Sequence, residues 1–176
     1  METLDEEAVR EAQEIALRAL ERTRRTRREL ERRLKERGID AVAAREALNR
    51  LERVGLIDDL EYARAFLREK LGRRAVGARL LRGQLVARGV SGAMADQVMA
   101  ELASAEDAGV SNRTELERAQ RAAAQFVRRY ARLDPRTRRQ RLSAALVRRG
   151  FDYDTVSEAL RAMESAAPQE GESDSG

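Results

Sequence analysis

The 176-residue sequence contains no cysteine, histidine or tryptophan, and only three tyrosines, three phenylalanines and two prolines. Without cysteine there can be no disulfide framework, no thiolate nucleophile and no cysteine-ligated metal site. The absence of histidine removes the commonest general base and metal ligand. No apolar run approaches the roughly 20 residues of a membrane-spanning helix, and the acidic N-terminus does not resemble a signal peptide. We therefore expect a cytoplasmic protein that has no membrane partner.

Catalytic motifs are lacking as well. The sequence contains no phosphate-binding loop, no dinucleotide fingerprint and no nucleophile with a base beside it. Asp58 and Asp59 are adjacent carboxylates, which could suggest acid–base or metal chemistry. Neighbouring residues diverge on a helix, however, and a helix cap followed by a first-turn acid accounts for both. We expect no catalytic residue, no metal and no cofactor, and hence a protein that is not an enzyme.

Charge is abundant but unevenly placed. Lysine plus arginine number 35 against 31 acids, which gives +4. The first seven residues hold four of the acids and the last eleven hold three, and neither segment contains a base, so residues 8–165 carry +11. A strongly basic body suggests a polyanionic partner. The alternative is that the basic runs are only solvated helix faces.

The most informative feature is an internal repeat. The pattern Leu-x3-Leu-x2-Arg-Gly, followed by an apolar residue and a capping residue, occurs at 30–40, 81–91 and 142–152. Glycine after the last helical residue can adopt the left-handed conformation that ends a helix in a Schellman motif. The apolar residue that follows would then pack on the second leucine of the pattern, and Asp40, Ser91 or Asp152 would cap the next helix. Each copy therefore predicts one helix end and one helix start.

Apolar residues at helical spacing lie before and after each of these turns, which predicts three helices per copy. Capping boxes at Thr26/Glu29 and Asp58/Glu61, and the Asp134-Pro135 pair, mark further helix starts. We expect Gly72 and Gly77 to separate the first two helices of the middle copy.

The predicted fold is all-α: three tandem three-helix repeats that form an elongated array, because each repeat is too small to be stable alone. The expected boundaries are 1–57 for the first repeat with its acidic start, 58–104 for the second, 105–113 for a linker, 114–165 for the third and 166–176 for a disordered acidic tail.

Basic residues concentrate on the second helix of each predicted repeat. Residues 22–37 contain nine bases and three acids, residues 73–88 contain five arginines and no acid, and residues 118–149 contain eleven arginines and one acid. Equivalent helices of a repeat protein tend to face the same side, so these bases could form one continuous surface. All aromatic residues except Tyr153 occupy predicted core positions, so DNA binding would depend on phosphate contacts rather than on base stacking.

Residues Gly55–Phe66 (GLIDDLEYARAF) resemble the signature of the RecX family, regulators of the RecA recombinase. Residues 77–91, 25–34 and 142–151 are similar to three further segments of that family, in the right order. The sequence departs from the family pattern at Val76, where an aromatic residue is common, and at Gln84, where the family has glutamate. The resemblance covers almost the whole basic body.

The resemblance implies a curved, monomeric regulator active in DNA repair, recombination and the SOS response. Such a protein lodges in the groove of the RecA–single-stranded-DNA filament and inhibits RecA ATPase, strand exchange and coprotease activities. Its partners would be RecA and the phosphates of single-stranded DNA. We expect the contact to be made by nine arginines: Arg28, Arg32, Arg73, Arg74, Arg79, Arg82, Arg138, Arg139 and Arg141.

Two alternatives remain open at this point. A general DNA-binding helical protein would act without RecA and bind naked duplex, with an affinity that falls steeply as salt rises. A helical-repeat scaffold would bind neither DNA nor RecA.

Overall fold

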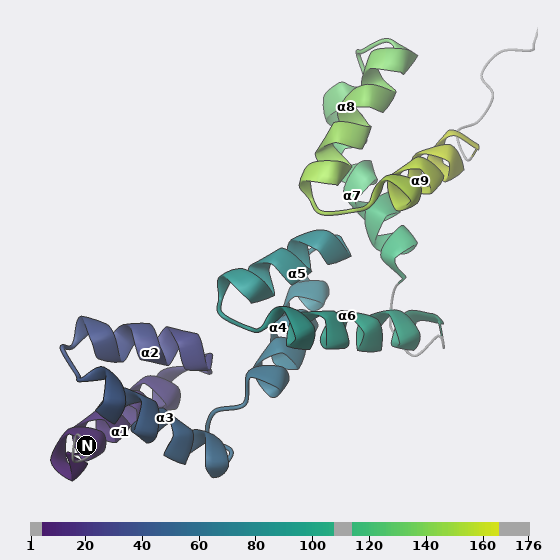
Figure 1. The fold of residues 1–176 in the computed structure, drawn as a ribbon. Helices are drawn as coiled ribbons and strands as arrows, with labels where there is room; N and C mark the ends of the chain where they lie inside the picture. Colours follow the sequence, from purple (N-terminus) through teal and green to yellow (C-terminus); the bar gives the residue numbers. More distant parts are fainter. Residues whose placement is uncertain (1–4, 108–113, 166–176) are drawn as a thin grey trace, which may run out of the picture. The chain divides into compact units, whose positions relative to one another are not determined.

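A computed structural model describes residues 5–107 and 114–165, which form nine helices and no strand (Figure 1). This confirms the all-α prediction and the three helices of each repeat. The helices of the first repeat are α1 (Glu6–Arg22), α2 (Arg27–Glu36) and α3 (Ala41–Arg53). Those of the second are α4 (Asp59–Arg73), α5 (Ala78–Ala87) and α6 (Gly92–Asp107), and those of the third are α7 (Glu115–Tyr130), α8 (Pro135–Arg148) and α9 (Tyr153–Ser165).

The second helix of each repeat ends in the predicted Schellman motif. At the end of α2, Ile39 N–H donates to the Leu34 carbonyl and Gly38 N–H donates to that of Lys35. The same pair of bonds recurs at Gly89 and at Gly150, and all three glycines have positive φ. A fourth motif, which the repeat pattern does not indicate, ends α3 at Gly55 (φ +74°). Left-handed backbone at these points explains why glycine ends each helix.

The predicted helix starts are also confirmed. Thr26 and Glu29 form a complete capping box at α2, and Asp134 accepts from Thr137 N–H ahead of Pro135 at α8. Asp58 caps α4 by accepting from Glu61 N–H. After the Schellman turns, the side chains that accept the first free N–H groups of the next helix are those of Asp40, Ser91 and Asp152.

Two predicted boundaries in the middle repeat are wrong. Gly72 does not separate two helices, because α4 runs through it to Arg73 and the break covers residues 74–77. The helix α6 extends to Asp107, so the first three residues of the expected linker, 105–107, are helical. A lone glycine costs a helix only about 1 kcal/mol, which packing and neighbouring helical residues readily offset. The remainder of the predicted linker and the predicted tail lie outside the described residues.

Contacts divide the chain into two compact units. The first contains the described residues of Met1–Glu69 with Arg82–Ala100, and the second those of Lys70–Leu81 with 101–176. Each unit therefore holds one complete terminal repeat and part of the middle repeat. The three-domain boundaries of the sequence pattern stay a prediction.

In the first unit, α1, α2 and α3 pack against one another around a core rich in alanine (Figure 1, purple to blue). Leu30 and Leu34 of α2 and Leu48 of α3 are buried there, as the repeat pattern predicts. Ile57, which precedes α4, belongs to the same core. Alanine permits close approach of the helices, which explains how a chain with few aromatic residues forms a core.

In the second unit, α7, α8 and α9 enclose the other core (Figure 1, green to yellow). Phe151 is fully buried against Leu142 and Leu146 of α8 and the alanines of α7, and Phe126 packs at the edge. Ala75, from the α4–α5 break, joins this core. The third repeat is therefore packed around the aromatic residue that follows its Schellman glycine.

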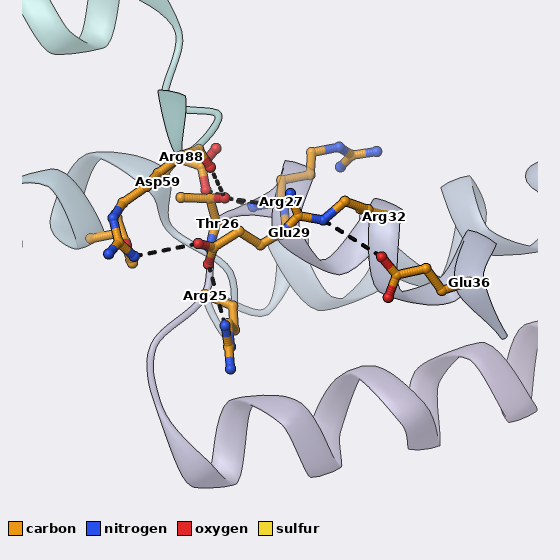
Figure 2. A network of polar contacts seen from close by, with 9 residues as sticks. Arg25, Thr26, Arg27, Glu29, Arg32, Glu36, Asp59 and Arg88 are labelled. Carbon is orange, nitrogen blue, oxygen red and sulfur yellow. Dashed lines mark hydrogen bonds and ion pairs between the residues drawn. The ribbon is translucent and has the colours of Figure 1, made fainter. Parts of the chain in front are cut away.

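A group of contacts, here called the first joint, connects the N-terminus of α2 to the middle repeat (Figure 2). The fully buried Thr26 hydroxyl donates to the Arg88 carbonyl at 2.6 Å, and Arg27 N–H donates to the Asp59 carboxylate at 2.8 Å. The Arg88 guanidinium lies over the Phe66 ring, 5.4 Å from its centroid, and donates to the Tyr62 hydroxyl at 3.0 Å. One backbone donor at the start of α2, Arg27 N–H, and the hydroxyl of the capping Thr26 therefore bind acceptors that lie far away in the sequence.

The second joint repeats this arrangement at the N-terminus of α5. Gly77 N–H donates to the Arg149 carbonyl at 2.9 Å, and Ala78 N–H donates to the Glu115 carboxylate at 2.8 Å. The Arg149 guanidinium lies 4.8 Å from the centroid of Phe126. A Cβ at Gly77 would come within 2.3 Å of the Gly150 carbonyl, so this close approach requires glycine.

The two joints use equivalent positions of the repeat. Asp59 and Glu115 are each the first residue of the first helix of a repeat, and Arg88 and Arg149 each precede a Schellman glycine. In both joints, carboxylate and carbonyl oxygens of one repeat accept from the N-terminus of the second helix of the preceding repeat. Four N–H groups at a helix start lack intrahelical partners, and here the following repeat provides partners for some of them.

The Schellman glycines should differ in their sensitivity to alanine. Gly38→Ala introduces a Cβ with no heavy atom within 4 Å and should lower the free energy of unfolding by about 1 kcal/mol, the cost of left-handed backbone. Gly150→Ala adds a clash with Leu80 Cβ and backbone N at 2.3 and 2.4 Å, and Gly89→Ala a clash with Arg28 Cβ at 2.4 Å. Both should cost clearly more than Gly38→Ala in urea unfolding. Equal losses for all three variants would contradict packing across the joints.

Candidate nucleic-acid interface

The nine arginines of the predicted interface are divided between the two units. Arg28, Arg32 and Arg82 lie in the first unit. The second unit contains the other six, namely Arg73, Arg74, Arg79, Arg138, Arg139 and Arg141. All nine are exposed except Arg138, which is half-buried. One continuous basic surface across all three repeats stays a prediction.

In the first unit, Arg28 and Arg82 both lie at the turn between α5 and α6. The aliphatic stem of Arg28 covers Gly89, and Nη2 of Arg82 would be 3.8 Å from a Cβ at Gly92. Arg82 also forms a two-pronged ion pair with Asp96, and this hydrogen bond holds the pKa of Asp96 below its ordinary value. Arg82 is therefore already bound to an acid of its own repeat.

Acids neutralise much of the basic charge around α2. Arg32 lies 3.8 Å from Glu36 within the helix. Ion pairs also join three other arginines of this segment to acids, namely Arg24 to Glu61, Arg25 to Glu29, and Arg27 to both Glu31 and Glu52. Glu52 comes from α3 and Glu61 from α4, so the local count of bases and acids overstates the free charge of α2.

In the second unit, the six arginines do not gather at one place. Arg73 ends α4 and Arg74 lies in the break that follows. Arg79 N–H donates to the Gly150 carbonyl, which holds the start of α5 against the C-terminal turn of α8. The arginines of 138–141 precede Gly150 by 9 to 12 residues. At 1.5 Å per residue this separation is roughly 14 to 18 Å along the helix axis. The six predicted arginines of this unit therefore form two separate groups, one within residues 73–79 and one within residues 138–141.

Arg138 and Arg139 line a hollow of about 310 Å³ among α7, α8 and α9. Its other lining residues are mostly apolar: Val127, Pro135, Leu142, Leu160, Met163 and Glu164. Arg139 Nη1 donates to both carboxylate oxygens of Glu164 at 2.5 Å. Arg141 is exposed and does not line this hollow.

Four arginines that the predicted interface leaves out surround the α7–α8 turn. They are Arg128, Arg129, Arg132 and Arg136. All four are exposed, and none forms an ion pair with a carboxylate of residues 5–107 or 114–165. Their density was visible in the sequence as part of the eleven arginines of 118–149, but nothing local distinguishes them from the paired arginines of α2.

The adjacent carboxylates Asp58 and Asp59 have structural roles. Asp58 caps α4, and Asp59 accepts from Arg27 N–H in the first joint. Burial raises the pKa of Asp59, although the Arg27 N–H opposes that rise. Among the described residues, no group of three or more acids is placed to hold a metal ion.

The aromatic residues are placed as predicted. Tyr62, Phe66 and Phe151 are buried, Phe126 and Tyr130 are half-buried, and Tyr153 is 73% exposed. No base-stacking platform of several aromatic rings exists in the described part of the chain. Within that part, no helix has the length and apolar character needed to cross a membrane.

Comparison with known proteins identifies the family. The models of the first, second and third three-helix domains of RecX match residues 12–51, 58–99 and 114–160. The chain belongs to the RecX family. It is 35% identical to the regulatory protein RecX of Streptomyces coelicolor over 93% of this chain and 81% of that protein. The RecX protein of Halorhodospira halophila is 36% identical over 94% of this chain and 92% of its own.

Solved structures of RecX share the fold. The crystal structure of RecX from Lactobacillus salivarius superposes with a TM-score of 0.80 at 20% identity, covering 92% of this chain and 99% of that one. A second crystal structure of a regulatory protein RecX gives a TM-score of 0.77 at 22% identity, covering 88% of this chain and 73% of that one. The three family models and the curated relatives confirm the resemblance to the RecX family, and these structures confirm its fold.

Substitution of Asp59 should alter the pH dependence of stability. Because the pKa of Asp59 is raised in the folded protein, its contribution to stability is present at low pH and is lost as pH rises above the ordinary value of 3.8. Asp59→Asn keeps an oxygen that can accept from Arg27 N–H but cannot ionise. Its free energy of unfolding relative to wild type should therefore rise between about pH 3 and about pH 6.

Asp40→Asn provides the control of opposite sign. Hydrogen bonds from the Ala43 and Val42 N–H groups lower the pKa of Asp40, so its contribution appears above that lowered pKa and is lost on acidification. The Asp40→Asn variant should lose stability relative to wild type as pH rises over the same range. Urea midpoints that shift in parallel for both variants would contradict these assignments.

Proposed function

We propose that this protein binds the RecA–single-stranded-DNA filament in its groove and inhibits RecA ATPase, strand exchange and coprotease activity, acting as a cytoplasmic monomer. The observation that supports this most strongly is the presence of all three RecX three-helix domains in order along the chain. The names of its relatives describe regulatory proteins, not enzymes. A regulator of this kind acts by occupying a surface and needs no catalytic group.

The arginines of the α4–α5 break and the start of α5 support a contact with the filament. Arg73 at the end of α4, Arg74 in the break and Arg79 in the first turn of α5 are all exposed, and the second joint holds the start of α5 against the third repeat. Guanidinium groups bind phosphate oxygens and carboxylates alike. This segment is therefore suited to touch filament DNA and acidic protein surface together.

Charge reversal at this segment should abolish the inhibition. Wild-type protein at substoichiometric amounts should reduce RecA ATPase on single-stranded DNA. The variant Arg73→Glu, Arg74→Glu, Arg79→Glu should lose this inhibition with unchanged helicity by circular dichroism, because the reversed charges repel phosphates. A control with the same charge change at exposed positions outside the basic helices, Arg10→Glu, Arg18→Glu, Arg45→Glu, should inhibit as wild type does. Full inhibition by the first variant would refute the proposal for this segment.

The alternative of a general DNA-binding helical protein predicts a different result. Such a protein would bind naked duplex DNA tightly at low salt and leave RecA ATPase unchanged at substoichiometric amounts. The inhibition assay, run beside duplex binding, separates the two functions.

A further inference from the structure

Two segments of this protein carry the same sequence charge but differ in the structure. Residues 22–37 hold nine bases and three acids, and residues 128–141 hold seven arginines and one acid, so each has a net charge of +6. A count of charges along the chain therefore does not distinguish them as sites for a polyanion. The two segments are distinguished instead by the residues that the fold places beside each of them.

The positive charge of the segment 22–37 is compensated in part. Four of its nine bases form ion pairs, and two of the acids involved, Glu52 and Glu61, come from outside the segment. Asp59 also lies against its backbone, 2.8 Å from Arg27 N. A phosphate that approached this segment would have to compete with carboxylates already in place.

Residues 128–141 form what we call the arginine hairpin: the end of α7, the α7–α8 turn and the first two turns of α8. Of its seven arginines, only Arg139 forms an ion pair with a carboxylate in the described part of the chain. The one acid within it, Asp134, is occupied in capping α8, where hydrogen bonds with Thr137 lower its pKa. Against the acids of residues 5–107 and 114–165, the other six arginines have no carboxylate partner and can bind an external anion.

The charge of the whole third repeat agrees with this difference. Residues 114–165 contain twelve arginines and seven acids, a balance of +5. Residues 58–107 contain eight bases and eight acids, and residues 5–57 contain fourteen bases and twelve acids. The excess positive charge of the described chain is thus greatest in the repeat that carries the arginine hairpin.

We propose that the arginine hairpin is the site at which this protein binds the phosphate backbone of single-stranded DNA, and that the segment 22–37 is not. The choice of DNA strand rests on the function proposed above, and the hairpin assigns its contact to particular residues. Exposed guanidinium groups supply forked donors for phosphate oxygens. The only aromatic ring in the hairpin, that of Tyr130, is half-buried and stacks on Phe126 instead. Binding is therefore salt-dependent and independent of base sequence.

The test compares two variants of the full chain that change the charge equally. The hairpin variant is Arg128→Glu, Arg129→Glu, Arg132→Glu. The control variant, Arg22→Glu, Lys35→Glu, Arg37→Glu, alters three exposed bases of the 22–37 segment that form no ion pair in the described chain. Affinity for a fluorescently labelled oligothymidylate is measured by anisotropy at several salt concentrations.

The hairpin variant should bind at least about tenfold more weakly at low salt. The slope of log affinity against log salt should become less steep by about 2 units, since three phosphate contacts at about 0.7 each are lost. The control variant should keep the wild-type slope. Glutamate near the C-terminus of α7 opposes the helix dipole, so the variant Arg128→Gln, Arg129→Gln, Arg132→Gln is measured too and should weaken binding in the same direction with unchanged helicity.

Three results would overturn the inference. One is an equal loss of slope in the hairpin and control variants, which would indicate only general attraction to a basic protein. Another is unchanged affinity of the hairpin variants for both DNA and DNA-free RecA. The third is unchanged DNA affinity together with weakened binding to DNA-free RecA, which would assign the hairpin to a protein surface.

RecA ATPase measured with the same proteins keeps this inference separate from the proposed function. If wild-type protein leaves RecA ATPase unchanged but the hairpin variants lose DNA affinity, the filament function fails and the hairpin assignment stands. If wild-type protein inhibits RecA and the hairpin variants bind DNA normally, the assignment fails and the filament function stands.

Discussion

The structure depends on how the N-termini of α2 and α5 are satisfied. A helix start leaves N–H groups without intrahelical partners, and burying them unpaired would cost roughly 1–3 kcal/mol each. In this protein the next repeat supplies acceptors. The carboxylates of Asp59 and Glu115 and the carbonyl of Arg149 accept from backbone N–H groups, and the carbonyl of Arg88 accepts from the hydroxyl of the capping Thr26. Each pair of neighbouring repeats is therefore held by directional polar bonds as well as by apolar contact. This interdependence suits repeats whose small, alanine-rich cores could not stabilise them individually.

The joints also show structural roles for residues that composition alone does not identify as structural. Arg88 and Arg149 belong to the repeated Leu-x3-Leu-x2-Arg-Gly pattern and add to the basic count, yet their guanidinium groups lie over aromatic rings within the fold. Gly77 has no positive φ, but the carbonyl of Gly150 leaves no room for a side chain. Part of the arginine content of this RecX-family chain therefore builds the structure, and another part stays exposed at the surface.

The arginines of this protein thus differ in what they contact: some lie within the fold, some pair with acids and some are exposed. Exposed ion pairs contribute at most about 1 kcal/mol to stability, so they are not what holds the first unit together, but they do decide how strongly its arginines attract phosphate. Acids pair with four of the nine bases of residues 22–37, whereas only one of the seven hairpin arginines pairs with an acid of the described residues. The middle repeat, although electrically balanced over residues 58–107, exposes arginines at the start of α5.

The sequence by itself determined the helices, their caps, the Schellman glycines and the buried faces, because these features depend on residues within one or two turns of each other. Its error at Gly72 arose where a local signal of helix ending was too weak to oppose its neighbours. Only the tertiary structure decided which arginines are neutralised and which helix starts meet Asp59 and Glu115. The atoms concerned are 32 and 37 residues apart for these carboxylates, and 25 for Arg27 and Glu52. No local periodicity encodes contacts over such separations; they exist only once the repeats have packed.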